Sequence, residues 1–404
     1  ADIANAARLC HEVPPILRTF DRWGQRIDEV EFHPAYHDLF TLAARHGVHN
    51  AAWADAPGRS HVLHTALEYL FGQIEQGICC PLTMTYAGVP ALRAQPDLAA
   101  TWEPKLTASD YDPRFLPLHE KSAATIGMAM TEKQGGSDVR ANTTRALPDG
   151  DGWRLRGHKW FCSAPMSDAF LTLAQTDRGL TCFLVPRWLP DGTRNPFWIQ
   201  RLKDKLGNRS NASSEIEYLD TFAWSVGEQG RGVRTILEMV HHTRLDCALA
   251  AAGLVRQSFV QAAHHAHHRR AFGHLLIDQP LMRNVLADLA LDSEAFTLAF
   301  LRLGEAFDSA DADDAAFSRV GVAIVKYWTN KRCPTLVAEA MECLGGVGYV
   351  EESGMPRLYR EAPLNGIWEG SGNVICLDVL RAMQREPDAP ADLAAATATS
   401  FTYS

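Results

Sequence analysis

The hydrophobic pattern of this chain changes character twice, and these changes constrain its fold more than any other feature. Residues 1–120 carry apolar side chains at the three-and-four spacing of helices, as in the run 61–77. Residues 122–226 carry short apolar or alternating runs separated by turn residues such as 148–152, which is typical of strands. The helical pattern returns after Gly232. The sequence therefore predicts helices, then a block of strands, then helices again.

We expect three domains and a tail from this pattern. An N-terminal all-α domain covers 1–121, a middle β-barrel or sandwich covers 122–228, a C-terminal α-helical bundle covers 229–385, and a flexible tail covers 386–404. At least six short strands are expected in the middle domain, at 125–131, 153–163, 169–175, 180–186, 197–202 and 215–219. Long helices are expected at 233–267, 280–306, 312–344 and 373–384, with Gly345 and Gly346 ending the third.

Composition excludes several classes of protein. With 404 residues, 46% hydrophobic and 22% charged, the chain is neither disordered, collagen-like nor a small disulfide scaffold. The net charge of −9 gives no general attraction for nucleic-acid phosphates. Nine cysteines without a C-x-x-C spacing predict free, buried thiols in a reducing cytoplasm. No apolar stretch approaches the roughly 18 residues of a membrane helix, so we expect no membrane span.

Common cofactor and metal motifs are absent from the sequence. It contains neither the dinucleotide-binding G-x-G-x-x-G after a strand nor a P-loop, and the Gly-rich run 344–349 follows an expected helix. His264, His265, His267 and His268 have helical spacing, but no nearby carboxylate or cysteine completes a ligand set. We therefore expect no metal site there, and interpret the histidines as a solvated or cofactor-facing helix end.

The segment from Met128 to Asp138 is the densest local signal. Gly135 and Gly136 permit a tight turn with exposed backbone N–H groups, and Ser137 adds a short polar side chain beside them. Such a turn can cradle an anionic or heteroaromatic ligand. The alternative interpretation is an ordinary turn between domains.

A second signal is the segment 366–373. Glu369 lies in a Gly-flanked loop beside Trp368, and Ser371 or Asn373 can cap the helix that follows. Packing a carboxylate against an aromatic ring disfavours its charged form, which raises its pKa toward the range of a general base. The alternative interpretation is a surface glutamate at a helix start.

Several short sequence motifs, taken in the order in which they occur along the chain, resemble those of the acyl-CoA dehydrogenase superfamily of flavoproteins. They are Thr131-Glu132-x-x-x-Gly136-Ser137-Asp138, Gly157-x-Lys159-x-Phe161-x-Ser163, Gly207-x-Arg209, Arg269-x-x-Phe272-Gly273, Leu344-Gly345-Gly346 and Trp368-Glu369-Gly370-Ser371. The segments 130–138, 201–212 and 368–373 are similar to the AidB-like branch, associated with the adaptive response to DNA alkylation. The resemblance spans about residues 25–385 and implies an acyl-CoA dehydrogenase-like fold.

The resemblance implies FAD as cofactor and a homotetramer in which a neighbouring subunit completes each FAD site. In the family, the T-E-x-x-x-G-S-D segment lines the flavin, and the following aromatic and hydroxyl contact its ring. Arginine and phenylalanine of the R-x-x-F motif would approach the partner's dinucleotide. The residues thereby assigned to FAD are Met130, Thr131, Gly136, Ser137, Phe161, Ser163, Arg269, Phe272, Gln279, Glu342, Gly345, Gly346, Ser371 and Asn373.

Glu369 falls on the family's catalytic-base position, and Arg244 matches an arginine near it. The implied reaction removes the α-proton of an acyl-CoA thioester with Glu369 and transfers the β-hydrogen as hydride to flavin N5. The pocket departs from the family where Trp368 replaces tyrosine and Phe161 replaces tryptophan. The acyl chain and the electron acceptor stay open.

Two alternatives to a dehydrogenase remain. One is a flavin-containing, DNA-binding protein that protects against DNA alkylation, with weak or vestigial dehydrogenase activity. The branch binds DNA partly through a C-terminal extension, and this sequence stops at Ser404, soon after the core. We therefore expect the extension to be absent and do not favour DNA as partner. The other alternative is a related flavin oxidase or monooxygenase acting on a substrate without CoA.

Overall fold

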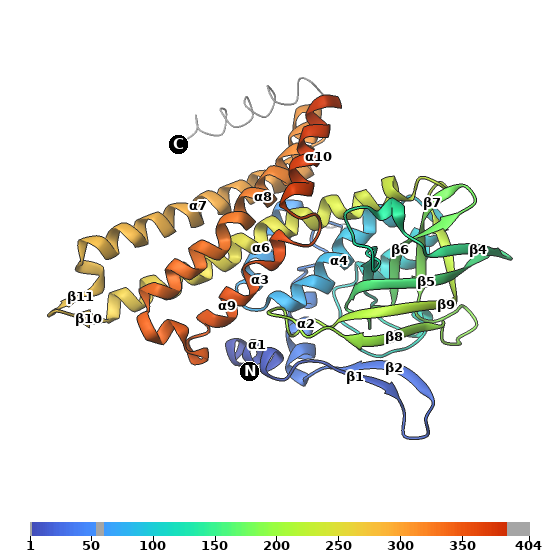
Figure 1. The fold of residues 1–404 in the computed structure, drawn as a ribbon, viewed down its shortest axis with the longest axis horizontal. Helices are drawn as coiled ribbons and strands as arrows, with labels where there is room; N and C mark the ends of the chain where they lie inside the picture. Colours follow the sequence, from blue (N-terminus) through green and yellow to red (C-terminus); the bar gives the residue numbers. More distant parts are fainter. Residues whose placement is uncertain (1, 54–59, 386–404) are drawn as a thin grey trace. The chain divides into compact units, whose positions relative to one another are not determined.

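The computed structural model describes residues 2–53 and 60–385, which fall into two compact units (Figure 1). The first unit contains Ala1–Ala54 and Gly77–Thr243, and the second contains Asp55–Gln76 and Arg244–Ser404. The predicted flexible tail, 386–404, lies outside the described residues. Across the described part of the chain, each helix is too short or too polar to cross a bilayer.

The N-terminal part of the first unit is mostly helical, but it includes a β-hairpin that the sequence pattern did not predict. Its strands are β1 (Ile16–Phe20) and β2 (Arg26–Glu31), paired antiparallel. Asp21 closes the turn by accepting hydrogen bonds of 2.8 Å from the N–H groups of Trp23 and Gln25. The predicted all-α character of 1–121 is therefore wrong at this hairpin. The helices of this N-terminal part are α1 (Ile3–Glu12), α2 (Pro34–Arg45), α4 (Gln76–Leu92) and α5 (Pro96–Leu106).

The middle of the chain forms the expected barrel. Five strands close it in the order β4-β5-β9-β7-β6, because β6 pairs with both β4 and β7, while β3 and β8 extend it by pairing with β6 and β9. Phe170, Phe183, Phe197 and Tyr218 fill its core. The strands are β3 (Ile126–Ala129), β4 (Arg145–Asp149), β5 (Gly152–Ser163), β6 (Ala169–Thr176), β7 (Gly179–Pro186), β8 (Phe197–Leu202) and β9 (Ser213–Val226).

Helix α4 approaches this barrel closely. A Cβ atom on Gly88 would lie 2.6 Å from the Ile126 side chain of β3, so only glycine permits this packing. The Ile126 N–H also donates to Thr85 Oγ1 of α4 at 3.3 Å. Strand β3, which leads into the segment 130–138, is therefore packed tightly against α4.

The second unit is a helical bundle. Its apolar core is shared by three long helices, α6 (Gly232–His268), α7 (Pro280–Asp308) and α8 (Ala312–Cys343) (Figure 1). Only the part of α6 from Arg244 onward belongs to this unit. Helix α10 (Gly372–Arg385) packs on α8, and α3 (His61–Gly72) packs on α7. The short strands β10 (Arg270–Ala271) and β11 (His274–Leu275) connect α6 to α7, and α9 (Met355–Glu361) follows α8. The predicted helix 61–77 instead ends at Gly72.

Eight of the nine cysteines are buried, as predicted. Cys376 is exposed, which corrects the prediction for that residue. It lies on α10, next to Leu377, which is itself half exposed, so this turn of the helix faces solvent in the single chain.

Candidate functional site

In the first unit, a buried ion pair anchors the segment 130–138. Lys159 Nζ of β5 lies 2.9 Å from Glu132 Oε1, and both side chains have no solvent exposure. The other carboxylate oxygen of Glu132 accepts hydrogen bonds from the N–H and hydroxyl of Thr143 at 2.6 and 2.9 Å. Lys159 also donates to the Leu173 carbonyl at 2.8 Å. The two motif strings, T-E-x-x-x-G-S-D and G-x-K-x-F-x-S, are therefore joined through their charged members.

This pair has perturbed proton affinities. Burial alone raises the pKa of Glu132, but the Lys159 charge and the hydrogen bonds from Thr144 and Thr143 outweigh it and lower the pKa to about 2. Burial lowers the pKa of Lys159, which the Glu132 carboxylate opposes. The pair supports the loop and is shielded from solvent, so we assign it no proton transfer.

The predicted cofactor residues of this loop lie on its open side. Gly136 and Ser137 are exposed, whereas Met130 and Thr131 are half-buried. The Met130 carbonyl accepts from the Asn142 side chain at 2.9 Å, and the Thr131 carbonyl accepts from the Trp160 N–H at 2.8 Å. Because a Cβ atom on Gly136 would lie 2.6 Å from Thr131 Oγ1, the loop can hold this shape only with glycine there.

Phe161 and Ser163 follow on β5. The Phe161 ring is 51% exposed, a large apolar surface for a residue in the middle of a strand. Lys203 Nζ lies 4.4 Å from the centre of that ring, and Ser163 Oγ lies 3.5 Å from Ser213 Oγ. The structure thus places a half-exposed aromatic ring and a hydroxyl on the strand that carries Lys159.

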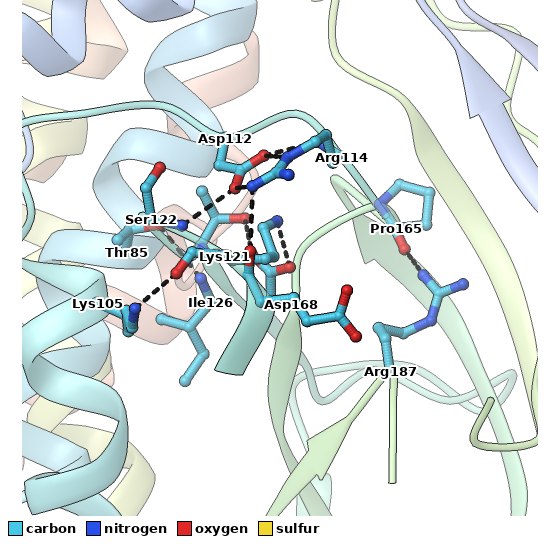
Figure 2. A network of polar contacts seen from close by, with 12 residues as sticks. Thr85, Lys105, Asp112, Arg114, Lys121, Ser122, Ile126, Pro165, Asp168 and Arg187 are labelled. Atoms are coloured by element: carbon cyan, nitrogen blue, oxygen red, sulfur yellow. Dashed lines mark hydrogen bonds and ion pairs between the residues drawn. The ribbon is translucent and has the colours of Figure 1, made fainter. Parts of the chain in front are cut away.

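A second buried network supports the start of β3 (Figure 2). Lys121 Nζ lies 2.5 Å from Asp168 Oδ1, and the Thr125 N–H donates to Asp168 Oδ2 at 2.8 Å. Lys105 donates to the Lys121 carbonyl at 2.6 Å. Burial raises the pKa of Asp168, which the Lys121 charge opposes. The chain that enters the barrel is therefore held by a charge pair shielded from water.

In the second unit, Glu369 lies in the loop between α9 and α10. Its backbone has φ of +57°, and that of the following Gly370 has φ of +102°. A non-glycine residue in this left-handed region costs of order 1–3 kcal/mol and persists only when its surroundings fix it. The neighbouring Trp368 is held by a 2.7 Å hydrogen bond from its Nε1 to Asn365 Oδ1.

Two cations hold the backbone of this loop. Arg244 Nε of α6 donates to the Glu369 carbonyl at 3.0 Å, and Arg244 also pairs with Asp378 of α10 at 2.5 Å. Lys326 Nζ of α8 donates to the carbonyls of Trp368 at 2.9 Å and Gly370 at 2.8 Å. Arg244 therefore bonds the main chain of the predicted base.

The remaining predicted cofactor residues of this unit lie in two groups. Ser371 and Asn373 adjoin the Glu369 loop and are exposed. The second group lies around the C-terminal end of α6, about 36 Å along this helix from Arg244. Leu344, next to this group, packs in the core with Leu276 and Ile277 of the α6–α7 connection. Within one chain, the length of the helical bundle therefore separates the two groups. The residues of the second group are Arg269, Phe272, Gln279, Glu342, Gly345 and Gly346.

The residue types fit a flavin dinucleotide in each unit. In the first unit, the exposed Gly136 and Ser137 and the half-exposed Phe161 ring are residue types that suit a polar heteroaromatic ring. In the second unit, the exposed Arg269 guanidinium suits a phosphate, and the exposed Glu342 carboxylate suits ribose hydroxyls.

Sequence reasoning missed several residues of these sites. Lys159 was named only as a member of a motif, and Lys326 and Asp378 were not singled out. A buried triad was missed as well: His64 Nε2 lies 3.0 Å from Asp246 Oδ1 and 3.5 Å from Glu68 Oε2. The i,i+4 spacing of His64 and Glu68 was the available signal, but Asp246 is far away in sequence.

Comparison with known proteins identifies the family. Residues 1–113 match the adaptive response protein AidB N-terminal domain, 127–221 the acyl-CoA dehydrogenase middle domain, and 230–384 the acyl-CoA dehydrogenase C-terminal domain. The chain belongs to the acyl-CoA dehydrogenase family, in its AidB-like branch, and is an acyl-CoA dehydrogenase-like oxidoreductase. The predicted fold class is thereby confirmed.

Individual relatives show the extent of the similarity. The chain is 50% identical over 391 residues to the putative acyl-CoA dehydrogenase AidB of Escherichia coli, covering 96% of this chain and 72% of that protein. It is 33% identical to acyl-CoA dehydrogenase family member 11 of Caenorhabditis elegans, covering 94% of this chain and 64% of that protein. The crystal structure of C. elegans ACDH-11 in complex with C11-CoA superposes with a TM-score of 0.88 at 30% identity, covering 95% and 67%.

Proposed function

We propose that this protein oxidises an acyl-CoA thioester with bound FAD, and that Glu369 removes the α-proton. The observation that carries the proposal is the fixed backbone of Glu369. Its left-handed φ is retained while the carbonyls of Trp368, Glu369 and Gly370 each accept a hydrogen bond from a cationic side chain. A structure that holds one glutamate so firmly suits a base that must meet a substrate carbon at a set angle.

The chain's own residues then have distinct tasks. Glu369 accepts the α-proton on its carboxylate, and Trp368, fixed by Asn365, limits the space beside it. Phe161 offers its exposed face to a flavin ring, and the loop around Gly136 offers backbone N–H groups to it. When bound, FAD supplies the acceptor for the β-hydride.

Two features support a long substrate and an assembled protein. A relative of 30% identity has been crystallised with C11-CoA, which supports an acyl-CoA of medium or greater length. Phe272 is 93% exposed with φ of +53°, and Arg269, three residues earlier, is exposed as well. We propose that both reach the FAD of a neighbouring subunit in a homotetramer, since an aromatic ring so exposed gains from being covered.

An anaerobic titration tests this function. Purified protein is mixed with short, branched and long acyl-CoA thioesters while the flavin absorbance is followed. We expect bleaching by at least one thioester, at least about a thousandfold slower in Glu369→Gln, whose amide cannot accept the proton. Glu352→Gln, an exposed carboxylate of the same unit, is the matched control and should bleach like the parent.

Other outcomes direct attention to the alternatives. A flavin-containing protein that no thioester bleaches contradicts the dehydrogenase proposal. Retention on duplex DNA at roughly 0.1 M salt would then favour the DNA-binding alternative. Fast reaction of the reduced flavin with oxygen would favour an oxidase or monooxygenase.

A further inference from the structure

Lys326 is an unusual residue for the middle of a helix. It is only 1% exposed, although a lysine ammonium is strongly hydrated and is almost never fully buried without partners. Its partners are main-chain carbonyls, those of Trp368 and Gly370, the two residues that flank Glu369. A buried cation whose hydrogen bonds bracket one glutamate calls for an explanation beyond helix packing.

The surroundings of Lys326 define its electrostatic role. Glu369 on the loop and Arg244 and Cys247 on α6 act electrostatically on Lys326, and Arg244 is itself paired with Asp378 of α10. Burial lowers the pKa of Lys326 and the Arg244 charge lowers it further, whereas Cys247 and Glu369 raise it.

The backbone geometry explains why such a residue is needed. Gly370 is itself left-handed, and a Cβ atom there would lie 3.1 Å from Ile375 and 3.3 Å from Arg244. There is therefore little space around Gly370, and the loop carbonyls point toward the side chains of Lys326 and Arg244. Without Lys326, two inward-facing carbonyls lose their donor, and unsatisfied buried carbonyls favour a different loop conformation.

We propose that Lys326 is a positioning residue that holds the Glu369 loop in its reactive conformation. This inference rests on the proposed function of Glu369 as the base. Lys326 itself touches neither thioester nor flavin in this scheme. It acts through its hydrogen bonds to the main chain on either side of Glu369.

The experiment compares Lys326→Met, Lys326→Arg and the parent. Lys326→Met removes the donor of both carbonyls, so we expect thioester-dependent bleaching to slow about tenfold to a hundredfold. Hydrogen exchange of the amides at 367–371, measured without thioester, should accelerate. Lys326→Arg keeps the donors and should recover part of the bleaching rate and bring the loop exchange back toward the parental value.

Controls separate this inference from the proposed function. Arg332→Met removes an exposed cation of the same helix, one that pairs with Asp292 of α7, and should leave bleaching and loop exchange unchanged. If Glu369→Gln bleaches normally, the proposed function fails. If Glu369→Gln is inactive but Lys326→Met keeps the parental bleaching rate and amide exchange, the role of Lys326 is overturned. If Lys326→Met does not fold, Lys326→Gln replaces it: loop exchange faster than in Arg332→Met supports the role, and equal exchange overturns it.

Discussion

The Lys159 ammonium and the Glu132 carboxylate form an ion pair of 2.9 Å in which neither side chain is exposed. The pair connects β5 with the segment 130–138 inside the barrel unit. Removing one partner of a buried ion pair typically costs about 3–5 kcal/mol, because the other charge is left without compensation. The shape of the proposed flavin loop therefore depends on two residues that do not reach its surface.

The first prediction concerns acid stability. The pKa of Glu132 is lowered from 4.5 to about 2 in the folded protein, so its contribution is complete above pH 4.5 and is lost as pH falls toward 2. Glu132→Gln should lower the free energy of unfolding at pH 7 and flatten its fall between pH 4.5 and 3. Urea unfolding at several pH values measures this. Glu352→Gln should keep the parental slope, and an unchanged slope in Glu132→Gln would contradict the prediction.

The second prediction concerns the network of Figure 2. Lys121→Met leaves the buried Asp168 carboxyl without its ammonium partner, and we expect a loss of about 3–5 kcal/mol in the free energy of unfolding. The matched control is Arg156→Met, which breaks the exposed pair with Asp220 and should cost under about 1 kcal/mol. Equal losses in the two variants, measured by urea unfolding, would show that burial of the pair contributes nothing.

The third prediction concerns the loop glycine. Gly136→Ala places a Cβ atom 2.6 Å from Thr131 Oγ1, so the loop must move, and we expect FAD affinity to fall about tenfold or more. Fluorescence titration of the apoprotein with FAD measures the affinity. In a Thr131→Ala background, which removes the clashing hydroxyl, Gly136→Ala should cost less. Equal costs in both backgrounds would mean that the clash is not the cause.

The fourth prediction concerns assembly. Phe272→Asp should shift the protein toward smaller species in sedimentation velocity and weaken FAD retention, because a charge there resists being covered by a partner. Phe272→Tyr, which keeps the ring, should retain the parental distribution. A parental sedimentation profile for Phe272→Asp would remove this residue from the proposed subunit contact.

Periodicity predicted most of the elements. The strand expected at 197–202 coincides with β8, and the helix expected at 233–267 differs from α6 by one residue at each end. Hydrophobic spacing is a local property of the chain, so it can be read without knowing the fold. The hairpin of β1 and β2 was missed because only two residues of its strands, Asp28 and Val30, are buried, and because Arg26 bonds the Ile199 carbonyl of β8, far away in sequence.

The sequence by itself determined the fold class, and it predicted Glu369 and Arg244 as site residues from their motifs, because short motifs carry the local turn chemistry with them. Only the tertiary structure decided which cations are buried and what they bind. Lys326 and Lys331 are alike in sequence, five residues apart on α8, yet one bonds two loop carbonyls and the other is exposed. Burial of a charge is set by the helices and loops packed around it, and those contacts exist only once distant segments have come together.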